Sequence, residues 1–307
     1  MEREPLLLHS LTIFEPLLEA CLDAVAPKRV GEIGSETGGT TKLLVDWARR
    51  HDATVWTVEP FPAHDLLELE DQAAPLTVVR GRSPEALAEA PECGVWLIDG
   101  DHNYWTVRQE CQRAAADGSL AILHDVAWPC ARRDQYYDPT AIPPEGLHPH
   151  TWDAGVVPGD PGTRPVGGMR GDGQFAYAEH EGGEENGVLT AVESVAADRG
   201  DLELLVIPVV FGVGLLFPKA APWADAVRAA AAPYAGSELL TTLERNRISL
   251  YTRVLELQDE VAALSARHTG LAAEYERQAA ADAAELAWLR LERARALEAN
   301  GGAPAAR

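Results

Sequence analysis

Short apolar runs alternate with amphipathic segments along residues 28–218. Apolar runs that end in turn residues predict β-strands at 28–34, 54–60, 76–81, 94–100 and 119–125. Apolar positions at helical spacing predict helices at 40–51, 83–90, 103–118 and 187–200. This alternation predicts an α/β fold with a doubly wound, mostly parallel sheet and helices on both faces. The apolar runs 202–210 and 213–218 predict a terminal antiparallel strand pair, which brings the sheet to seven strands.

The segments outside this alternation predict the domain organisation. Residues 1–27 carry apolar side chains at helical spacing, which predicts an N-terminal helical segment packed on the main domain, residues 28–218. The pattern disappears at 126–186, a stretch dense in Pro and Gly. Long irregular segments inside compact domains are uncommon and usually functional, so we expect a lid or substrate wall. The alternative is a plain surface insertion.

Residues 219–298 predict a helical extension with a heptad pattern. A leucine recurs every seven residues along one seam of this helix: Leu243, Leu250, Leu257, Leu264 and Leu271. A second seam, three residues before the first, carries Leu240, Val254 and Val261. Arg247 and His268 also lie on this second seam, where polar residues fix register at a cost in stability. The first interpretation is a coiled coil that forms a homodimer or higher oligomer. The alternative is a long helix folded back on its own domain. Residues 299–307 predict a disordered tail.

Composition narrows the classes of partner and compartment. The 307 residues carry a formal charge of −22, which repels phosphate backbones, so we expect no nucleic-acid partner. Solubility is the simpler explanation of this charge. The four cysteines form no C-x-x-C pair, which argues against zinc knuckles and disulfides and favours a reducing compartment. The N-terminus lacks a signal peptide's apolar region, and no stretch is apolar enough to span a membrane. We therefore expect a soluble, cytoplasmic protein with no membrane partner.

The loop after the first strand has the spacing Glu32-x-Gly34-x-x-x-Gly38. Glycine permits a tight turn and lets a ligand approach without a Cβ in the way, and Thr40 or Thr41 is a candidate helix cap. The loop is neither a G-x-G-x-x-G fingerprint nor a P-loop, and its acid suits a positively charged ligand. Glu59 ends the second strand, where an acid typically accepts hydrogen bonds from ribose hydroxyls. A glycine loop alone also serves ordinary strand-to-helix turns, but with Glu59 it predicts a nucleoside-type cofactor.

These residues resemble the loop and the ribose-binding acid of the class I S-adenosylmethionine-dependent methyltransferases. The resemblance covers roughly residues 28–218 and implies a Rossmann-like methyltransferase sheet with 213–218 as the seventh strand. It implies that the amino-acid end of the cofactor lies near Glu32, Gly34, Ser35 and Gly38. By the same resemblance Glu59 would hold the ribose, Ser83 would border the adenine, and Asp99 would also lie among the cofactor-binding residues.

A second group of polar residues follows the fourth and fifth strands. Asp99 and Asp125 end adjacent strands, so their carboxylates would form an oxygen-rich site suited to Mg or Mn. His124 could add a nitrogen ligand, although neighbouring strand residues point to opposite faces, and Asp101 is another candidate third member. His102 suits the role of general base because imidazole titrates near neutrality. The alternatives are that Asp99 caps the following helix and that His102 binds a backbone carbonyl.

The sequence D-G-D-H, followed about 20 residues later by H-D, resembles the metal-assisted methyltransferases that modify sugars and natural products. That resemblance implies metal binding by Asp99 and by acids matching positions 124 and 125, with His102 as base; the chain departs from it by carrying His124. Residues 132–138 (RRDQYYD) could line a substrate pocket or hold the insertion to the domain, and His180 and Glu181 could approach the site or serve the insertion.

The function expected from these patterns is O-methylation of a small hydroxylated acceptor, such as a sugar or glycosylated metabolite, with S-adenosylmethionine and a divalent metal. Two alternatives remain open from the sequence. One is a metal-independent N-methyltransferase, in which Asp99 or His102 would orient an amine. The other is a non-catalytic methyltransferase-like scaffold that assembles through its heptad helix.

Overall fold

A computed structural model describes residues 7–72 and 75–300 of the chain. By its internal contacts the chain divides into two units, Met1–Leu255 and Glu256–Arg307. None of the helices in the described residues combines the length and apolarity needed to cross a bilayer.

The first unit is built on a seven-stranded sheet with the order β3-β2-β1-β4-β5-β10-β9. Its strands are β1 (Arg29–Ile33), β2 (Thr54–Val58), β3 (Leu76–Val79), β4 (Val95–Ile98), β5 (Leu120–His124), β9 (Leu202–Ile207) and β10 (Val213–Pro218). All pairings are parallel except those of β10, which runs antiparallel to both β5 and β9. The predicted fold class and the terminal antiparallel pair are therefore confirmed.

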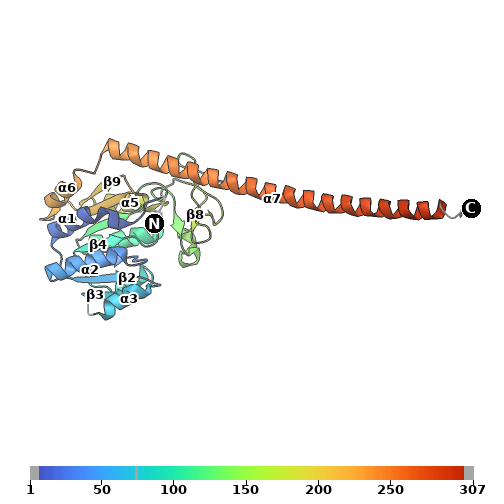
Figure 1. Cartoon of the computed structure of the whole chain (residues 1–307). Helices are drawn as coiled ribbons and strands as arrows, with labels where there is room; N and C mark the ends of the chain where they lie inside the picture. Colours follow the sequence, from blue (N-terminus) through green and yellow to red (C-terminus); the bar gives the residue numbers. More distant parts are fainter. Residues whose placement is uncertain (1–6, 73–74, 301–307) are drawn as a thin grey trace, which may run out of the picture. The chain divides into compact units, whose positions relative to one another are not determined.

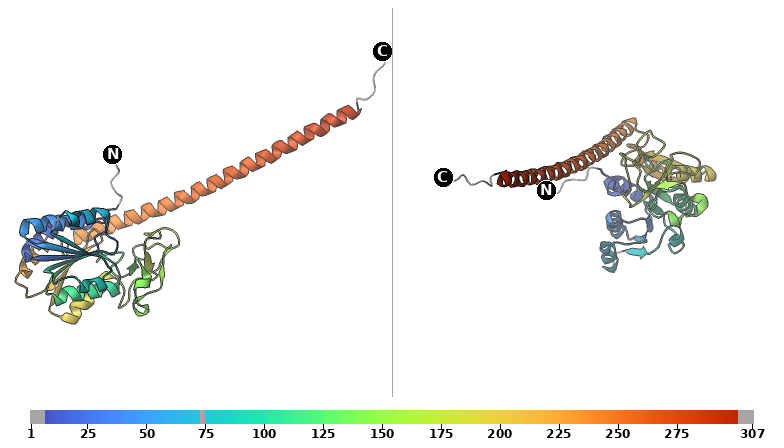
Figure 2. Two further views of the ribbon diagram at one scale, coloured as in Figure 1. Left: turned by 90° about the horizontal axis from the view of Figure 1, so that it is seen from below. Right: turned by 90° about the vertical axis from the view of Figure 1, so that its right-hand side faces the viewer.

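Helices cover both faces of this sheet (Figures 1 and 2). One face packs on η1 (Leu11–Phe14), α1 (Glu15–Val25), α2 (Gly39–His51) and α6 (Ala224–Ala231), and the other on η2 (Glu85–Ala88), α4 (Tyr104–Ala116) and α5 (Val188–Arg199). Alternation along β4 divides the two cores, because Val95 and Leu97 face the first while Trp96 and Ile98 face the second. The short helix α3 (His64–Asp71) was not predicted; it adds Leu66 to the first core.

The insertion after β5 contains a small sheet of its own. Its order is β6-β8-β7, all antiparallel, and the elements are β6 (Gln135–Tyr136), η3 (Pro139–Ala141), η4 (Pro144–Gly146), β7 (His150–Thr151) and β8 (Ala176–Ala178). Tyr136, Ile142 and Ala178 form its own buried cluster. The sequence pattern missed these strands, which are two or three residues long.

The last helix, α7 (Glu238–Asn300), begins in the first unit and forms the second. Residues 232–237 separate it from α6, a break that the predicted helical extension did not contain. Its first turns pack on the first unit, where Glu244, Ile248 and Thr252 are buried. The predicted disordered tail is helical at residues 299 and 300, and residues 301–307 lie outside the described part of the chain.

Candidate active site

The carboxyl ends of the central strands meet at one edge of the sheet, where strand order reverses between β1 and β4. Ligands bind at such switch points in open α/β sheets. Glu32 lies near the end of β1, Glu59 follows β2 and Asp99 follows β4. His124 ends β5, and Asp125 follows it directly. The fold therefore brings both predicted groups of residues to the same edge.

The glycine loop is pressed against the segment that follows β4. Gly34 has φ +81°, and a Cβ on it would lie 2.3 Å from the Asp99 carbonyl oxygen. The positive φ fits the tight turn that the glycine was expected to permit, and the group that leaves no room for a Cβ is the neighbouring backbone. The predicted threonine cap is wrong, because Gly38 occupies the N-cap of α2 and no side chain caps it.

Glu32 is buried beneath this loop. The Thr41 hydroxyl donates a 2.7 Å hydrogen bond to its Oε2, whereas its Oε1 has no hydrogen-bond partner among the described residues. Burial raises the pKa of Glu32 to about 7, although the neighbouring hydroxyls of Thr41 and Thr57 oppose the shift. A buried acceptor without a donor is costly, so this oxygen fits the ammonium or amide group of a ligand.

Glu59 holds the glycine loop to the end of β2. Its Oε2 accepts hydrogen bonds from the backbone N–H groups of Ser35 and Glu36, at 3.1 and 3.3 Å. Its Oε1 accepts one from the N–H of Phe61 at 3.0 Å. The sequence analysis predicted a ribose acceptor at this position, but it did not predict that the same carboxylate would order the loop.

Asp99, His102 and Asp125 bring one ligand atom each to within 4.8 Å of one another. His102 is buried, and its Nε2 lies 3.5 Å from Asp125 Oδ2. Although burial alone would raise it, His102 and His124 hold the pKa of Asp125 below its ordinary value. The two carboxylates suit a divalent cation, and the imidazole can serve either as a third ligand or as a base beside that cation.

His124 connects the two carboxylates of this cluster. Its Nδ1 lies 3.2 Å from Asp99 Oδ1 and 3.1 Å from Asp125 Oδ2, while its Nε2 lies 2.9 Å from the Val210 carbonyl oxygen. Burial alone would lower the pKa of His124, but Asp99 and Asp125 raise it well above the ordinary value. Strand alternation does not separate His124 from Asp125, because Asp125 lies beyond the strand with φ +59°. With oxygens at both ring nitrogens, His124 offers a metal less than His102 does.

Asp101 faces the insertion rather than this cluster. Its carboxylate accepts hydrogen bonds from the Asn103 side chain at 2.6 Å and from the Tyr137 backbone N–H at 3.4 Å. Burial raises its pKa above the ordinary value. The ring of Tyr137 lies 5.8 Å from that of His102, and Tyr137 is half exposed. Asp101 therefore helps to hold Tyr137 beside His102.

Most of the residues that could either line a substrate pocket or hold the insertion in place do the latter. Arg132 pairs with Glu193 on α5, and the fully buried Arg133 donates to the carbonyl oxygens of Ala178 and Pro161. The Glu181 carboxylate lies 3.9 Å from the Arg133 guanidinium. The side-chain amide of Asn186 donates a hydrogen bond to the backbone carbonyl oxygen of the exposed His180 at 2.9 Å, so His180 and Glu181 both serve the insertion.

Asp134 is a buried residue whose role the sequence did not reveal. Its Oδ1 accepts the N–H groups of Tyr104 at 2.8 Å and Gly187 at 2.7 Å, and its Oδ2 accepts the Tyr136 hydroxyl at 2.8 Å. It thereby ties the first turn of α4 to both ends of the insertion. Burial raises its pKa to about 6, against these hydrogen bonds.

Ser83 follows β3, as predicted, and its buried hydroxyl has no hydrogen-bond partner within residues 7–72 and 75–300. Glu110 on α4 is fully buried, and both of its carboxylate oxygens also lack partners in that part of the chain. Burial raises the pKa of Glu110 to about 8, while the Ser83 hydroxyl opposes the shift.

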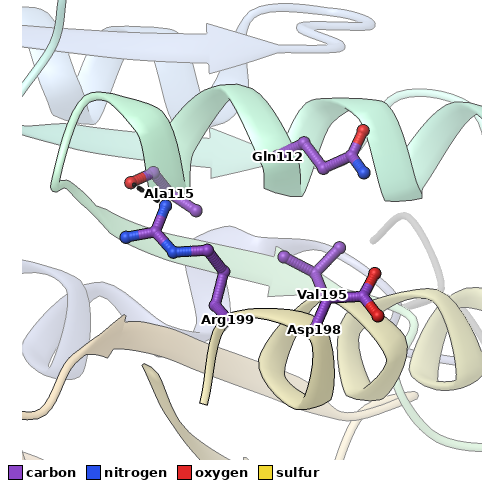
Figure 3. Close-up of a pocket in the computed structure, with 5 residues that line it drawn as sticks. All are labelled: Gln112, Ala115, Val195, Asp198 and Arg199. Atoms are coloured by element: carbon purple, nitrogen blue, oxygen red, sulfur yellow. Dashed lines mark hydrogen bonds between the residues drawn. The ribbon is translucent and has the colours of Figure 1, made fainter. Parts of the chain in front are cut away.

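A small hollow of about 190 Å³ lies between α4 and α5 (Figure 3). Arg199 crosses it and donates to the Ala115 carbonyl at 3.0 Å. Ala115 is at the end of α4, which starts at the carboxyl edge and runs back along the sheet, so this hollow is separate from the candidate active site.

Comparison with known proteins identifies the class of the central segment. Residues 32–126 match the family described as "Methyltransferase domain". This segment runs from Glu32 to just past Asp125 and contains both halves of the site. The match confirms the predicted resemblance to methyltransferases over this segment.

Solved structures with a similar arrangement include three methyltransferases. They are the Podospora anserina methyltransferase PaMTH1 with bound SAH (14% identity, 66% of this chain and 76% of that chain, TM-score 0.40), the O-methyltransferase TomG from Streptomyces achromogenes with SAM (15%, 69% and 82%, 0.42), and an O-methyltransferase family protein from Burkholderia thailandensis (12%, 67% and 56%, 0.37). No curated protein matches the chain.

Proposed function

We propose that this chain is an S-adenosylmethionine-dependent O-methyltransferase for a small hydroxylated acceptor, assisted by a divalent metal. The observation that carries the proposal is the convergence of Asp99, His102 and Asp125 at the sheet edge that also holds Glu32 and Glu59. A methyl acceptor bound at the first group would face a cofactor bound at the second.

The residues present fit the cofactor. S-adenosylmethionine supplies an electrophilic methyl group and carries an ammonium group and a ribose. The unpartnered Oε1 of Glu32 can accept a hydrogen bond from that ammonium group. Glu59 fixes the loop through Ser35 and Glu36 at its Oε2. Its Oε1 accepts the Phe61 N–H and keeps a second lone pair for a ribose hydroxyl.

The residues present also fit a metal. Asp99 and Asp125 would hold a hard cation such as Mg²⁺ or Mn²⁺, whose chemistry is to lower the pKa of a bound hydroxyl. His102, at 3.5 Å from the Asp125 carboxylate, is the candidate general base for the acceptor proton. Asp125 would stabilise the imidazolium that results, and Tyr137 would supply an aromatic wall for the acceptor.

The test measures cofactor binding, metal binding and turnover separately in one set of variants. Calorimetry should detect S-adenosylmethionine binding to the parent, and titration with a chelator should abolish turnover. His102→Ala should leave cofactor and Mn²⁺ affinity unchanged and lower kcat by about 10²–10⁴. Glu89→Ala, an exposed acid away from the edge, serves as the matched control.

Each contrary outcome points to a different function. Turnover that survives complete chelation would indicate metal-independent methylation, for instance of an amine. Loss of Mn²⁺ affinity in His102→Ala would make His102 a ligand instead of the base. An absence of cofactor binding at millimolar concentration would leave only the non-catalytic scaffold.

A further inference from the structure

The seam of α7 beyond the first unit presents a continuous apolar stripe. In the second unit this stripe is formed by side chains that are about half exposed: Leu257 (43%), Val261 (61%), Leu264 (60%) and Leu271 (56%). Contiguous apolar surface of this kind marks an interaction site. The heptad spacing restricts the partner to another helix.

The first turns of α7 are already occupied by the chain itself. Arg247, on the second seam, forms an ion pair with Glu244 and donates a hydrogen bond to the Leu8 carbonyl oxygen. Its guanidinium carbon lies 4.9 Å from the Phe211 ring centroid. The part of the seam available to a partner therefore begins near Leu250 and extends to Tyr275, after which the seam carries Gln278 and Asp282.

We propose that α7 pairs with α7 of a second copy of this chain in an antiparallel coiled coil centred between residues 262 and 263. In that register each apolar layer joins the two seams. Val261 lies opposite the partner's Leu264, and Val254 lies opposite the partner's Leu271. His268 and Tyr275 lie opposite leucines as well, so neither meets its own copy.

Charges beside the seam determine the direction of the pair. The residues directly before the second seam of α7 alternate in the sign of their charge: Arg253, Glu260, Arg267 and Glu274. In antiparallel coiled coils these positions face one another. The proposed register therefore sets Glu260 opposite the partner's Arg267 and Arg253 opposite the partner's Glu274. Two-fold symmetry repeats each pair, which gives four complementary contacts.

A parallel pair in register lacks these features. His268 would meet the partner's His268 in the core. The four charged positions would lie opposite uncharged residues: Gln258, Ser265, Ala272 and Ala279. The sequence of the helix therefore favours the antiparallel arrangement, since only that arrangement matches each charge with its opposite.

Engineered cysteines in the full chain test the direction. The four native cysteines are buried and free, so a thiol on α7 is the reactive one. Val254→Cys and Leu271→Cys chains, mixed and oxidised, should give a heterodisulfide between the two variants. Val254→Cys alone should give none, because antiparallel pairing separates the two Cys residues by about 17 residues, or roughly 25 Å. A strong homodisulfide of Val254→Cys would establish a parallel pair and overturn the proposal.

Charge reversal tests the register and does not depend on methyltransferase activity. By sedimentation the parent should be a dimer, and a monomeric parent would overturn the proposal. Glu260→Arg and Arg267→Glu should each weaken the dimer by about tenfold, and the double variant should restore it. Glu276→Arg, on the outer face of the same helix, is the control. Failure of the double variant to recover, with helicity unchanged by circular dichroism, would exclude this register.

Discussion

At the scale of single residues, Glu32 and Glu110 are both buried in the first unit but differ in what surrounds them. Glu32 lies at the candidate cofactor site and already has a donor in Thr41. Glu110 lies on α4, where the nearby Ser83 hydroxyl only partly opposes the effect of burial on its pKa. Burial raises the pKa of Glu32 to about 7 and that of Glu110 to about 8, so both retain protons in the folded chain that they lose when it unfolds.

Glu110 should therefore make the protein less stable as the pH rises. Between the unfolded pKa of 4.5 and the folded pKa of about 8, the folded chain binds more protons than the unfolded chain, so the free energy of unfolding falls with increasing pH. Glu110→Gln stays neutral and should lack this component, and it should be more stable than the parent by about 1–3 kcal/mol above pH 8.

Denaturant unfolding at a series of pH values measures this difference. Glu89→Gln, an exposed glutamate before β4, should keep the slope of the parent. Parallel stability curves for the parent and Glu110→Gln would show that Glu110 does not carry the effect.

At the scale of elements, the sequence predicted what depends on periodicity and missed what depends on tertiary contacts. The strand β4 (VWLI) is a continuous apolar run and β5 (LAILH) is nearly one, as parallel strands buried on both faces are in any sequence. The strands β1 (RVGEI) and β2 (TVWTV) mix apolar and polar residues, and the turn residues that follow them made them visible. The helix α3 has a single fully buried apolar residue, Leu66, and many charges, so its periodicity is weak. The strands of the insertion are too short for any alternation to be visible.

The candidate site shows the same division. Strand ends located Glu59, Asp99 and Asp125, because polar residues directly after apolar runs are visible in a sequence, and the spacing of the glycine loop located Glu32. The contact of His124 with both carboxylates could not be predicted in this way. It depends on the left-handed conformation of Asp125, where the strand geometry has ended.

Asp134 joins α4 to the insertion, so its loss should loosen the connection between these two elements. Asp134→Ala would leave two buried N–H groups and the Tyr136 hydroxyl without an acceptor, at about 1–3 kcal/mol each. We expect the free energy of unfolding to fall by about 3–5 kcal/mol, and limited proteolysis to cut within residues 126–186.

Asp153→Ala is the matched control, since Asp153 is an exposed acid of the same insertion. Urea unfolding and mapping of the cleavage sites would measure both effects. An Asp134→Ala variant as stable and as resistant as Asp153→Ala would mean that the insertion is held by other contacts.

At the scale of the whole molecule, contacts of the first unit connect the start of α7 to the candidate metal site. Glu244 accepts the Phe211 N–H at 3.0 Å, and the neighbouring Val210 carbonyl lies 2.9 Å from His124 Nε2. Val210 and Phe211 have φ angles of +52° and +63°, a conformation that costs bulky residues about 1–3 kcal/mol each. The bond to Glu244 offsets part of that cost and holds the Val210 carbonyl beside His124.

Loss of Glu244 should therefore affect the active site as well as stability. Glu244→Ala leaves the Phe211 N–H without an acceptor, so the free energy of unfolding should fall by about 1–3 kcal/mol. The 210–211 segment can then relax, and His124 would hold Asp99 and Asp125 less firmly. Mn²⁺ affinity and turnover should each fall about tenfold.

Two variants serve as controls. Glu244→Gln, which keeps an acceptor oxygen, should recover most of the stability and of the Mn²⁺ affinity. Arg245→Ala, exposed at the next position of the helix, should change neither the stability nor the Mn²⁺ affinity. Calorimetry with Mn²⁺ and denaturant unfolding separate the two effects. A Glu244→Ala variant that is destabilised but binds Mn²⁺ like the parent would show that α7 supports the fold without acting on the site.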